Sequence, residues 1–394
     1  MKKFCKRWMV MFMSLCCLLC VSGCRANADV SDVKLYCLNI GKADCLILCC
    51  AGRNYLIDAG YEHTYPALET ALSSLNIHHL DGVFLTHCHE DHQGGLMQLA
   101  KSDVAIDHFY AAPIYHDVKE NEHPMILAAK ERGMDVEWLS SGDIIQIADG
   151  YSFRVLGPLQ ANTDNENNNS LVMYFSSPHG SILFTGDMKD EEENELMYDD
   201  LLQPCDVLKV AHHGDNGATS KAFINTVRPK YAIISTHPKQ EPDSASSEVL
   251  FRLARSGCEA YISYEYIDAI GITLHNGEVS TEEMAWHDIP KWHLQLGFEF
   301  DENNNILTLS NNSDETIRLS GCILYLSRKD EVVALDDITL EPNTSFIIGG
   351  KKANKKVDMK LNNKKILHDK KLDVAIIYDA NGRLMAICNN GQEE

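Results

Sequence analysis

The run of residues 86–92, Thr-His-Cys-His-Glu-Asp-His, constrains the fold more than any other feature of this chain. It places four potential metal ligands, three imidazoles and a carboxylate, within six residues. An apolar stretch at residues 82–85 precedes it and Gly94-Gly95 follows, so we expect the run to lie in a loop where a buried strand ends. Zinc and manganese favour such ligands. The run therefore predicts a divalent metal site at the edge of a sheet.

Apolar patterns predict alternating strands and helices as far as about residue 285. Residues 33–38, 45–50 and 54–57 have the composition of buried strands, whereas residues 65–75 carry apolar side chains at helical spacing. Layers of helix over sheet suit this alternation, and they predict one α/β domain over residues 33–285. Further strands are expected at residues 105–110, 171–175, 182–185, 207–211 and 260–263, and further helices at residues 125–132 and 246–256.

The pattern changes near residue 294. Helical periodicity is absent beyond this point, and short strands alternate with turns rich in Asn, Asp and Gly. Such spacing is typical of a small all-β domain, which we expect over residues 297–394 after a linker at residues 286–296. The clearest strands are at residues 307–309, 317–319, 322–326 and 374–378.

The first residues have the composition of a processing signal. A positive segment precedes an apolar stretch at residues 8–21, which is shorter than the roughly 20 residues of a membrane span. Val-Ser-Gly-Cys at residues 21–24 resembles a bacterial lipobox, which implies lipid on Cys24 and an anchor outside the cytoplasmic membrane. We expect a signal peptide at residues 1–23 and a linker at residues 24–32. The alternative is an ordinary secretory signal with an incidental Cys24.

The net charge of −22 excludes a protein that binds nucleic acid over its whole surface, because such binding needs a basic face. One segment departs from this acidic balance. Nine lysines and only two aspartates lie in the run that begins at Lys351 and ends at Lys371. The run predicts contact with a polyanion such as DNA, an anionic wall polymer or lipid head groups, and the alternative is a solvated loop.

The histidine run matches the H-x-H-x-D-H motif of the metallo-β-lactamase superfamily, and other motifs of that family follow in order. They supply Asp58 in Ile-Asp-Ala-Gly, Asp187 in Thr-Gly-Asp and His213 in Ala-His-His-Gly, each after an apolar stretch. The resemblance implies an αββα sandwich that holds two divalent ions, Zn²⁺ or alternatively Mn²⁺. It also implies that Asp58 supports the site from behind the ligands.

The same resemblance implies how the two ions divide the ligands. The first ion takes His87, His89 and the shared Asp187. The second takes the same carboxylate together with Asp91, His92 and His213.

Within the superfamily, the chain resembles the hydrolase domain of ComEC-type competence proteins, which act in DNA uptake. Residues 38–47 resemble the V-G-Q-G-D-A block of that group, and residues 168–172 resemble its N-x-S-L-V block. Asn169 then stands where classical zinc β-lactamases supply another histidine. The chain departs from the group at Lys42-Ala43 and at Asp215. We interpret the remaining histidines of this region as solvated surface residues, namely His108, His116, His123 and His179.

The resemblance implies a membrane-anchored, extracytoplasmic metallohydrolase of phosphodiesters, with nucleic acid as the expected substrate and DNA as one form of it. We expect Asp91 and His212 to take part in catalysis, the histidine by binding a phosphoryl oxygen or protonating the leaving group. A packed histidine at a strand end is the alternative for His212. One alternative function is a phosphoesterase that acts on cell-wall polymer substituents, and another is a non-catalytic adhesion or scaffold protein.

The C-terminal part resembles a lamin-tail-type domain, which has an Ig-like all-β fold. The resemblance is carried by residues 307–313, 317–322, 340–343 and 377–382. It implies a binding or positioning module, because no catalytic group of residues is present in these blocks.

Overall fold

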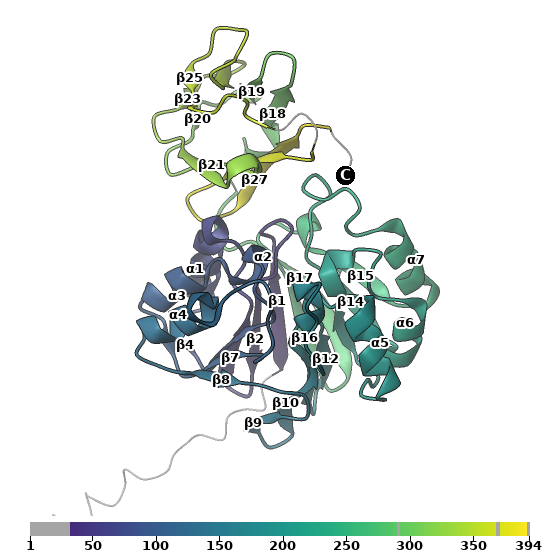
Figure 1. The fold of residues 1–394 in the computed structure, drawn as a ribbon. Helices are drawn as coiled ribbons and strands as arrows, with labels where there is room; N and C mark the ends of the chain where they lie inside the picture. The colour runs from purple at the N-terminus through teal and green to yellow at the C-terminus, as the bar shows by residue number, and fades with distance from the viewer. Residues whose placement is uncertain (1–31, 290–291, 368–370, 392–394) are drawn as a thin grey trace, which may run out of the picture.

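Two β-sheets pack face to face in the first part of the chain, and helices cover both outer faces (Figure 1). The computed structural model describes residues 32–289, 292–367 and 371–391. The expected signal peptide and Cys24 lie outside these residues. Within the described ranges, no helix is long and apolar enough to cross a membrane.

The first sheet has eight strands in the order β17-β16-β1-β2-β3-β5-β7-β8, and the second has seven in the order β15-β14-β13-β12-β11-β10-β9. The strands of the first sheet are β1 (Val33–Leu38), β2 (Leu46–Cys50), β3 (Arg53–Ile57), β5 (Gly82–Leu85), β7 (Phe109–Ala111), β8 (Val136–Trp138), β16 (Ala269–His275) and β17 (Glu278–Met284). Those of the second are β9 (Ile144–Ala148), β10 (Tyr151–Gly157), β11 (Val172–Ser177), β12 (Gly180–Phe184), β13 (Val207–Lys209), β14 (Tyr231–Ile234) and β15 (Glu259–Ile262).

Side-chain alternation along the strands divides the core into layers. In β1, Leu35 and Cys37 face the other sheet, whereas Tyr36 and Leu38 face the helices, because successive strand side chains point to opposite faces. The expected αββα arrangement is confirmed. The first sheet is covered by α1 (Tyr65–Ser74), α3 (Leu96–Lys101) and α4 (Pro124–Glu131), and the second by α5 (Asp190–Tyr198), α6 (Lys221–Val227) and α7 (Ser247–Arg255).

Two expected strands are wrong in extent. The single strand at residues 105–110 is two strands, because β6 (Ala105–Ile106) pairs with β4 (His79–Leu80) while β7 joins the main sheet. The exposed pair Asp107-His108 lets the chain move between these sheets. The strand expected at residues 207–211 ends at Lys209, because Ala211–Gly214 form a short turn of 3₁₀ helix.

Parallel pairing brings the motif residues to one edge of the sandwich. β5 pairs in parallel with β3 and β7, and β13 with β12 and β14, so these strands end on the same side. Asp58 follows β3, the histidine run follows β5, Asp187 follows β12 and His213 follows β13.

The C-terminal part is all-β, as expected from the sequence. Its core contains Leu307, Leu309, Leu324 and Ile377, and lies between the sheets β18-β19-β24-β25 and β22-β21-β26-β27. The strands are β18 (Leu296–Asp301), β19 (Ile306–Asn311), β20 (Ile317–Arg318), β21 (Ile323–Leu326), β22 (Glu331–Ala334), β23 (Thr339–Leu340), β24 (Ser345–Gly349), β25 (Met359–Lys360), β26 (Val374–Tyr378) and β27 (Leu384–Asn389).

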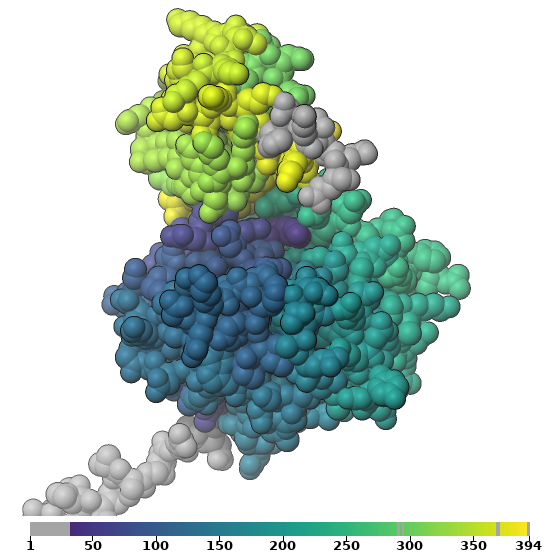
Figure 2. All heavy atoms as spheres, in the orientation of Figure 1, coloured from purple at the N-terminus to yellow at the C-terminus, as the bar shows by residue number. Residues whose placement is uncertain are grey.

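The C-terminal part rests on the end of the sandwich near residues 60–67 (Figure 2). Arg383 donates to Asp268 through Nε at 2.7 Å and Nη2 at 2.9 Å, and both side chains are buried. The His63 ring stacks on Tyr325, with 3.8 Å between ring centroids. Gly382 lies against the start of α1 with a φ of +78°, where a side chain would meet the backbone of Ala67.

Replacing Arg383 with Met should loosen this contact. It leaves the Asp268 carboxylate buried without its cation, and breaking a buried pair costs about 3–5 kcal/mol. We expect faster proteolysis between residues 285 and 295 and a lower free energy of unfolding in urea. Arg383→Lys is the matched control and should recover part of the loss, since lysine keeps the charge without the two-pronged geometry. Unchanged cleavage in Arg383→Met would contradict this role.

Candidate metal centre

Asp187 lies at the centre of the predicted site. Its Oδ2 atom is 3.3 Å from Nε2 of His92 and 3.3 Å from Nε2 of His213. Asp91 Oδ2 is 3.2 Å from the same atom of His213. Ligand atoms about 2.0–2.2 Å from a tetrahedral ion lie roughly 3.3 Å from each other, so these spacings suit one shared ion. The four ligand atoms all lie within 4.8 Å of one another.

His87 and His89 lie beside this group but outside it. Nε2 of His87 is 3.9 Å from Asp187 Oδ2 and 3.0 Å from Nδ1 of His89. The structure thus brings Asp91, His92, Asp187 and His213 together as one group of possible ligands. A second ion held by His87, His89 and Asp187 stays a prediction.

Hydrogen bonds from behind fix which ring nitrogen each histidine presents. Nδ1 of His92 donates to Asp58 Oδ2 at 2.7 Å, and Nδ1 of His213 donates to the main-chain oxygen of Ser235 at 2.8 Å. His89 instead pairs Nε2 with Asp117 Oδ2 at 3.2 Å. The first two rings therefore offer Nε2 to the centre and His89 offers Nδ1.

Thr86 sets the ring of His87 in the same way. Its hydroxyl donates to Asp58 Oδ2 at 2.8 Å, so its oxygen accepts from Nδ1 of His87 at 3.2 Å. Burial lowers the pKa of His87, so the ring is neutral, and its Nε2 lies 3.0 Å from Nδ1 of His89.

The backbone at the last ligand is strained. His212 and His213 both have left-handed conformations, with φ of +47° and +52°. Such conformations cost about 1–3 kcal/mol each for residues other than glycine, and they persist where the surroundings enforce them. The turn directs His213 inward, where it is fully buried, and leaves the His212 side chain 17% exposed at the rim.

A buried ion pair supports the part of the site that contains His213. Lys209 Nζ lies 2.8 Å from Asp44 Oδ2, and both side chains are 1% exposed. The other oxygen of Asp44 accepts from the Ser235 hydroxyl and lies 3.5 Å from Nδ1 of His213. Asp44 therefore positions both the histidine and the strand end that holds it.

The centre is strongly attractive to cations. Burial acts to lower the pKa of His213, but the carboxylates of Asp187, Asp91 and Asp44 outweigh it and raise the pKa to about 9. Burial also acts to lower the pKa of His92, but Asp187 and other carboxylates outweigh burial and raise this pKa. The field that holds protons on these rings also favours divalent ions in their place.

The residues around Asp187 fit a divalent metal ion. Nε2 of His92, Nε2 of His213 and Oδ1 of Asp187 are buried and make no hydrogen bond. Buried polar atoms without partners are uncommon in folded proteins. Here they are nitrogen and oxygen atoms of the kind that bind Zn²⁺ or Mn²⁺, and they converge on one point.

Asn169 forms hydrogen bonds within its own loop. Its Oδ1 accepts from the main-chain nitrogen of Asn162 at 2.8 Å, and its Nδ2 donates to Asn162 and to Glu166. The neighbouring Asn167 is the residue that reaches the rim, with Nδ2 3.2 Å from Nε2 of His212.

The interpretation of His123 and His179 as solvated is wrong. His123 is 1% exposed and lies 3.4 Å from the Cys88 sulfur, and His179 is 4% exposed beneath the hairpin that carries Asn276. Both follow a polar, turn-like stretch, which favours exposure in sequence, but tertiary packing covers them.

Three supporting residues were not identified from the sequence. Asp117 lies in a polar loop without pattern, and Lys209 interrupts an apolar strand, where lysine suggests exposure. Glu166 is buried and accepts from the main-chain nitrogens of Cys88 and His116. The only available signal was the charged residue within the apolar stretch at residues 207–211.

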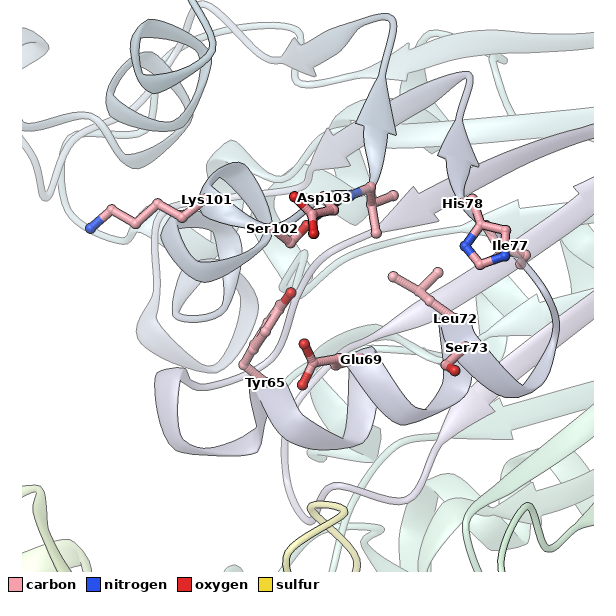
Figure 3. Close-up of a pocket in the computed structure, with 10 residues that line it drawn as sticks. Tyr65, Glu69, Leu72, Ser73, Ile77, His78, Lys101, Ser102 and Asp103 are labelled. Atoms are coloured by element: carbon pink, nitrogen blue, oxygen red, sulfur yellow. Dashed lines mark hydrogen bonds between the residues drawn. The ribbon is translucent and has the colours of Figure 1, made fainter.

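A separate pocket of about 380 Å³ lies between α1 and the end of α3 (Figure 3). Tyr65 and Glu69 of α1 line one side, and Ser102 and Asp103 line the other. None of the predicted site residues lines it.

Metal affinity should rise with pH. Below a pKa of about 9, a metal ion must displace the proton of His213. We expect zinc affinity to rise about tenfold per pH unit between 6.5 and 9 for each proton displaced, and to level off above. A chromophoric chelator, corrected for its own protonation, measures this in competition with the full chain.

The metal-free protein supplies the control. Its free energy of unfolding should fall as pH rises, whereas zinc affinity should rise. A histidine with a raised pKa stabilises the fold below pH 6.5, and this contribution is lost as pH rises through 9. Zinc affinity that is constant across this window would contradict the electrostatic account.

Comparison with known proteins agrees with this geometry. Residues 40–237, about half of the chain, match the family model of the metallo-beta-lactamase superfamily. ComE operon protein 3 of Bacillus subtilis is 31% identical over 211 residues, which are 51% of this chain and 26% of that protein. Competence protein ComA of Neisseria gonorrhoeae is 28% identical over 193 residues, 47% of this chain and 24% of that protein.

The chain thus spans about a quarter of the length of these two relatives. Among solved structures, Igni18, a metallo hydrolase of Ignicoccus hospitalis, is 15% identical with a TM-score of 0.40, and the match covers 65% of this chain and 100% of that one. The family match spans the histidine run, Asp187 and His213, and the chain belongs to the metallo-β-lactamase superfamily of hydrolases.

Proposed function

We propose that this protein is a metal-dependent phosphodiesterase that acts on nucleic-acid strands at the extracytoplasmic face of a membrane. The observation that carries the proposal is the rim of the metal centre. Beside the buried ligands stand His212, Asn167 and Lys42, which offer hydrogen-bond donors and positive charge to an anionic substrate.

Lys42 brings a cation to this rim. Burial acts to lower its pKa, but the carboxylates of Asp91, Glu241 and Asp187 raise it, so the ammonium group stays charged. Nζ of Lys42 pairs with Glu241 at 3.2 Å, and its main-chain nitrogen donates to the Gln240 side chain at 2.8 Å. A fixed ammonium group there favours a phosphate over a neutral substrate.

His212 is the partly exposed histidine of the rim. Its Nε2 lies 4.0 Å from Asp187 Oδ2, and its Nδ1 lies 3.6 Å from Asp215 Oδ1. Nδ2 of Asn167 contacts Nε2 at 3.2 Å, and Nε2, when protonated, can bind a phosphoryl oxygen or pass a proton to the leaving oxygen. Divalent ions, when bound, supply Lewis-acid stabilisation of the phosphoryl group and an activated water.

The relatives support nucleic acid as the substrate. One of them is named competence protein ComA, and the motifs of this chain resemble those of ComEC-type proteins, which act in DNA uptake. The all-β domain, which we propose to be lamin-tail-like, then positions the hydrolase. The lysines of the run from Lys351 to Lys371 that the structure describes are mostly exposed, and polyanion contact there stays a prediction.

Replacing Asp187 with Asn should abolish turnover of bis(p-nitrophenyl) phosphate and of single-stranded DNA by the full chain with Zn²⁺ or Mn²⁺. The change removes the negative charge of the carboxylate that the two proposed ions would share. We expect kcat/KM to fall by more than about a hundredfold. Release of nitrophenolate and gel analysis of labelled DNA measure it, and melting temperature reports folding.

Lys42→Gln is the matched variant for this experiment. It leaves every predicted metal ligand in place, so metal content should persist while KM for the diester rises. Wild-type protein with both ions bound and no turnover of either substrate would contradict the proposal. It would favour a scaffold role.

Membrane attachment is tested at Cys24. We expect Cys24→Ala to move the protein from the membrane fraction to the soluble fraction of the producing cells, because the sulfur that would carry the lipid is gone. Cys37→Ala, which removes a buried thiol within β1, is the control and should stay with membranes. Retention of Cys24→Ala on membranes would refute the lipid anchor.

A further inference from the structure

Helices α6 and α7 lie side by side on the outer face of the second sheet (Figure 1). A basic groove with an exposed aromatic ring is lined by residues of both helices. Its pocket of about 360 Å³ is lined by Lys221 and Asn225 of α6 and by Phe251 and Arg255 of α7. This volume lies in the range of roughly 300–1,000 Å³ that is typical of small-molecule sites.

Phe251 is unusual for a surface residue. Its side chain is 64% exposed, although Val249 and Leu253 of the same helix are fully buried. The Arg255 guanidinium lies 5.8 Å from the centre of its ring, and the exposed Lys221 stands across the pocket. An aromatic face flanked by cations is the combination that binds single-stranded nucleic acid, by base stacking and phosphate contact.

The groove continues toward the metal centre. A second pocket of about 370 Å³ shares Lys221 and Arg252 with the first, and it reaches Asn216 and Gly217, which follow the ligand His213 closely. Arg252 is not free for a ligand, because it donates to the main-chain oxygens of Ala218 and Thr219 and to Asn216. It holds the loop that joins the groove to the site.

Acidic residues limit where a strand can run. Asp190 and Glu193 line the second pocket, and the Glu193 carboxylate accepts from the main-chain nitrogen of Ser220 at 3.1 Å. The positive charge is therefore concentrated at Lys221 and Arg255, in a protein whose net charge is −22. A polyanion that binds this face is steered to the α6–α7 pocket.

We propose that the groove between α6 and α7 is a binding track for single-stranded nucleic acid. A base stacks on Phe251, Lys221 and Arg255 contact the adjoining phosphates, and the strand passes over the loop at residues 215–220 toward the metal centre. The direction of the strand rests on the proposed function, whereas its binding does not require turnover.

Fluorescence anisotropy with a labelled oligothymidylate tests the track, on the full chain in EDTA so that no hydrolysis occurs. Phe251→Ala should weaken binding roughly fivefold to a hundredfold, the range of one base–aromatic contact. The double variant Lys221→Glu/Arg255→Glu should make the fall of log affinity with log salt concentration less steep. The magnitude of the slope should decrease by roughly 1.4, which corresponds to two lost phosphate contacts.

Lys101→Glu/Lys130→Glu is the matched control, since it reverses two exposed charges on α3 and α4. It should bind the oligonucleotide as the wild type does. Groove variants that bind like the wild type would overturn the track, even if the wild type hydrolyses diesters. Weakened binding without any hydrolysis by metal-loaded wild type would keep the track and refute only the proposed function.

An abasic strand of equal length separates stacking from charge. It should bind the wild type more weakly than oligothymidylate and should be insensitive to Phe251→Ala. Equal binding of both strands would overturn the proposal in favour of an anionic polymer without bases.

Discussion

Four aspartates lie at one edge of the sandwich, namely Asp44, Asp58, Asp91 and Asp187. The architecture of this edge depends on how their negative charge is balanced. Asp44, Asp58 and Asp187 are at most 2% exposed. Burying an unpaired carboxylate costs several kcal/mol, so each needs a cation or several donors. Lys209 neutralises Asp44, and Thr86 with His92 binds Asp58. Asp187 faces chiefly imidazoles, and a divalent ion held by these residues would complete its balance.

The charge balance of these aspartates depends on residues from distant parts of the sequence that lie at the same edge of the sandwich. The parallel strands of both sheets end at the same edge, and the segment after each carries candidate ligands or a residue that supports them. Gly41 shows how tight the rim is: it has a φ of +88°, and a side chain there would strike Gln240. That glutamine accepts from the main chain of Lys42, so the rim depends on close backbone approach.

The position of the candidate ligands at one edge of the sandwich was predictable, because each follows an apolar strand within a short, ordered motif. The sandwich was predictable for the same reason, since strand and helix periods are local. The supporting groups were not. The pair of Asp44 and Lys209 joins segments far apart in sequence, and a lysine within a strand suggests exposure until both partners are seen buried. Likewise, only packing shows that Asn167 and not Asn169 reaches His212.

The all-β domain contacts the rim from the other side. Lys239 Nζ donates to the main-chain oxygen of Ile387 at 2.9 Å, and Asn389 donates back to Lys239. The next residues, Gln240 and Glu241, hold Lys42. The domain thus braces the loop that sets the charge beside the metal centre, while the groove between α6 and α7 leads to the centre from the second sheet.

The central claim is that Asp187 joins two metal ions. Anomalous diffraction from crystals of the zinc-loaded protein, recorded on both sides of the zinc absorption edge, tests it most directly. The account predicts two peaks roughly 3.5–4 Å apart, one beside His87 and His89 and one beside His92 and His213, with Asp187 between them. A single peak, or a pair that does not include Asp187, would contradict it.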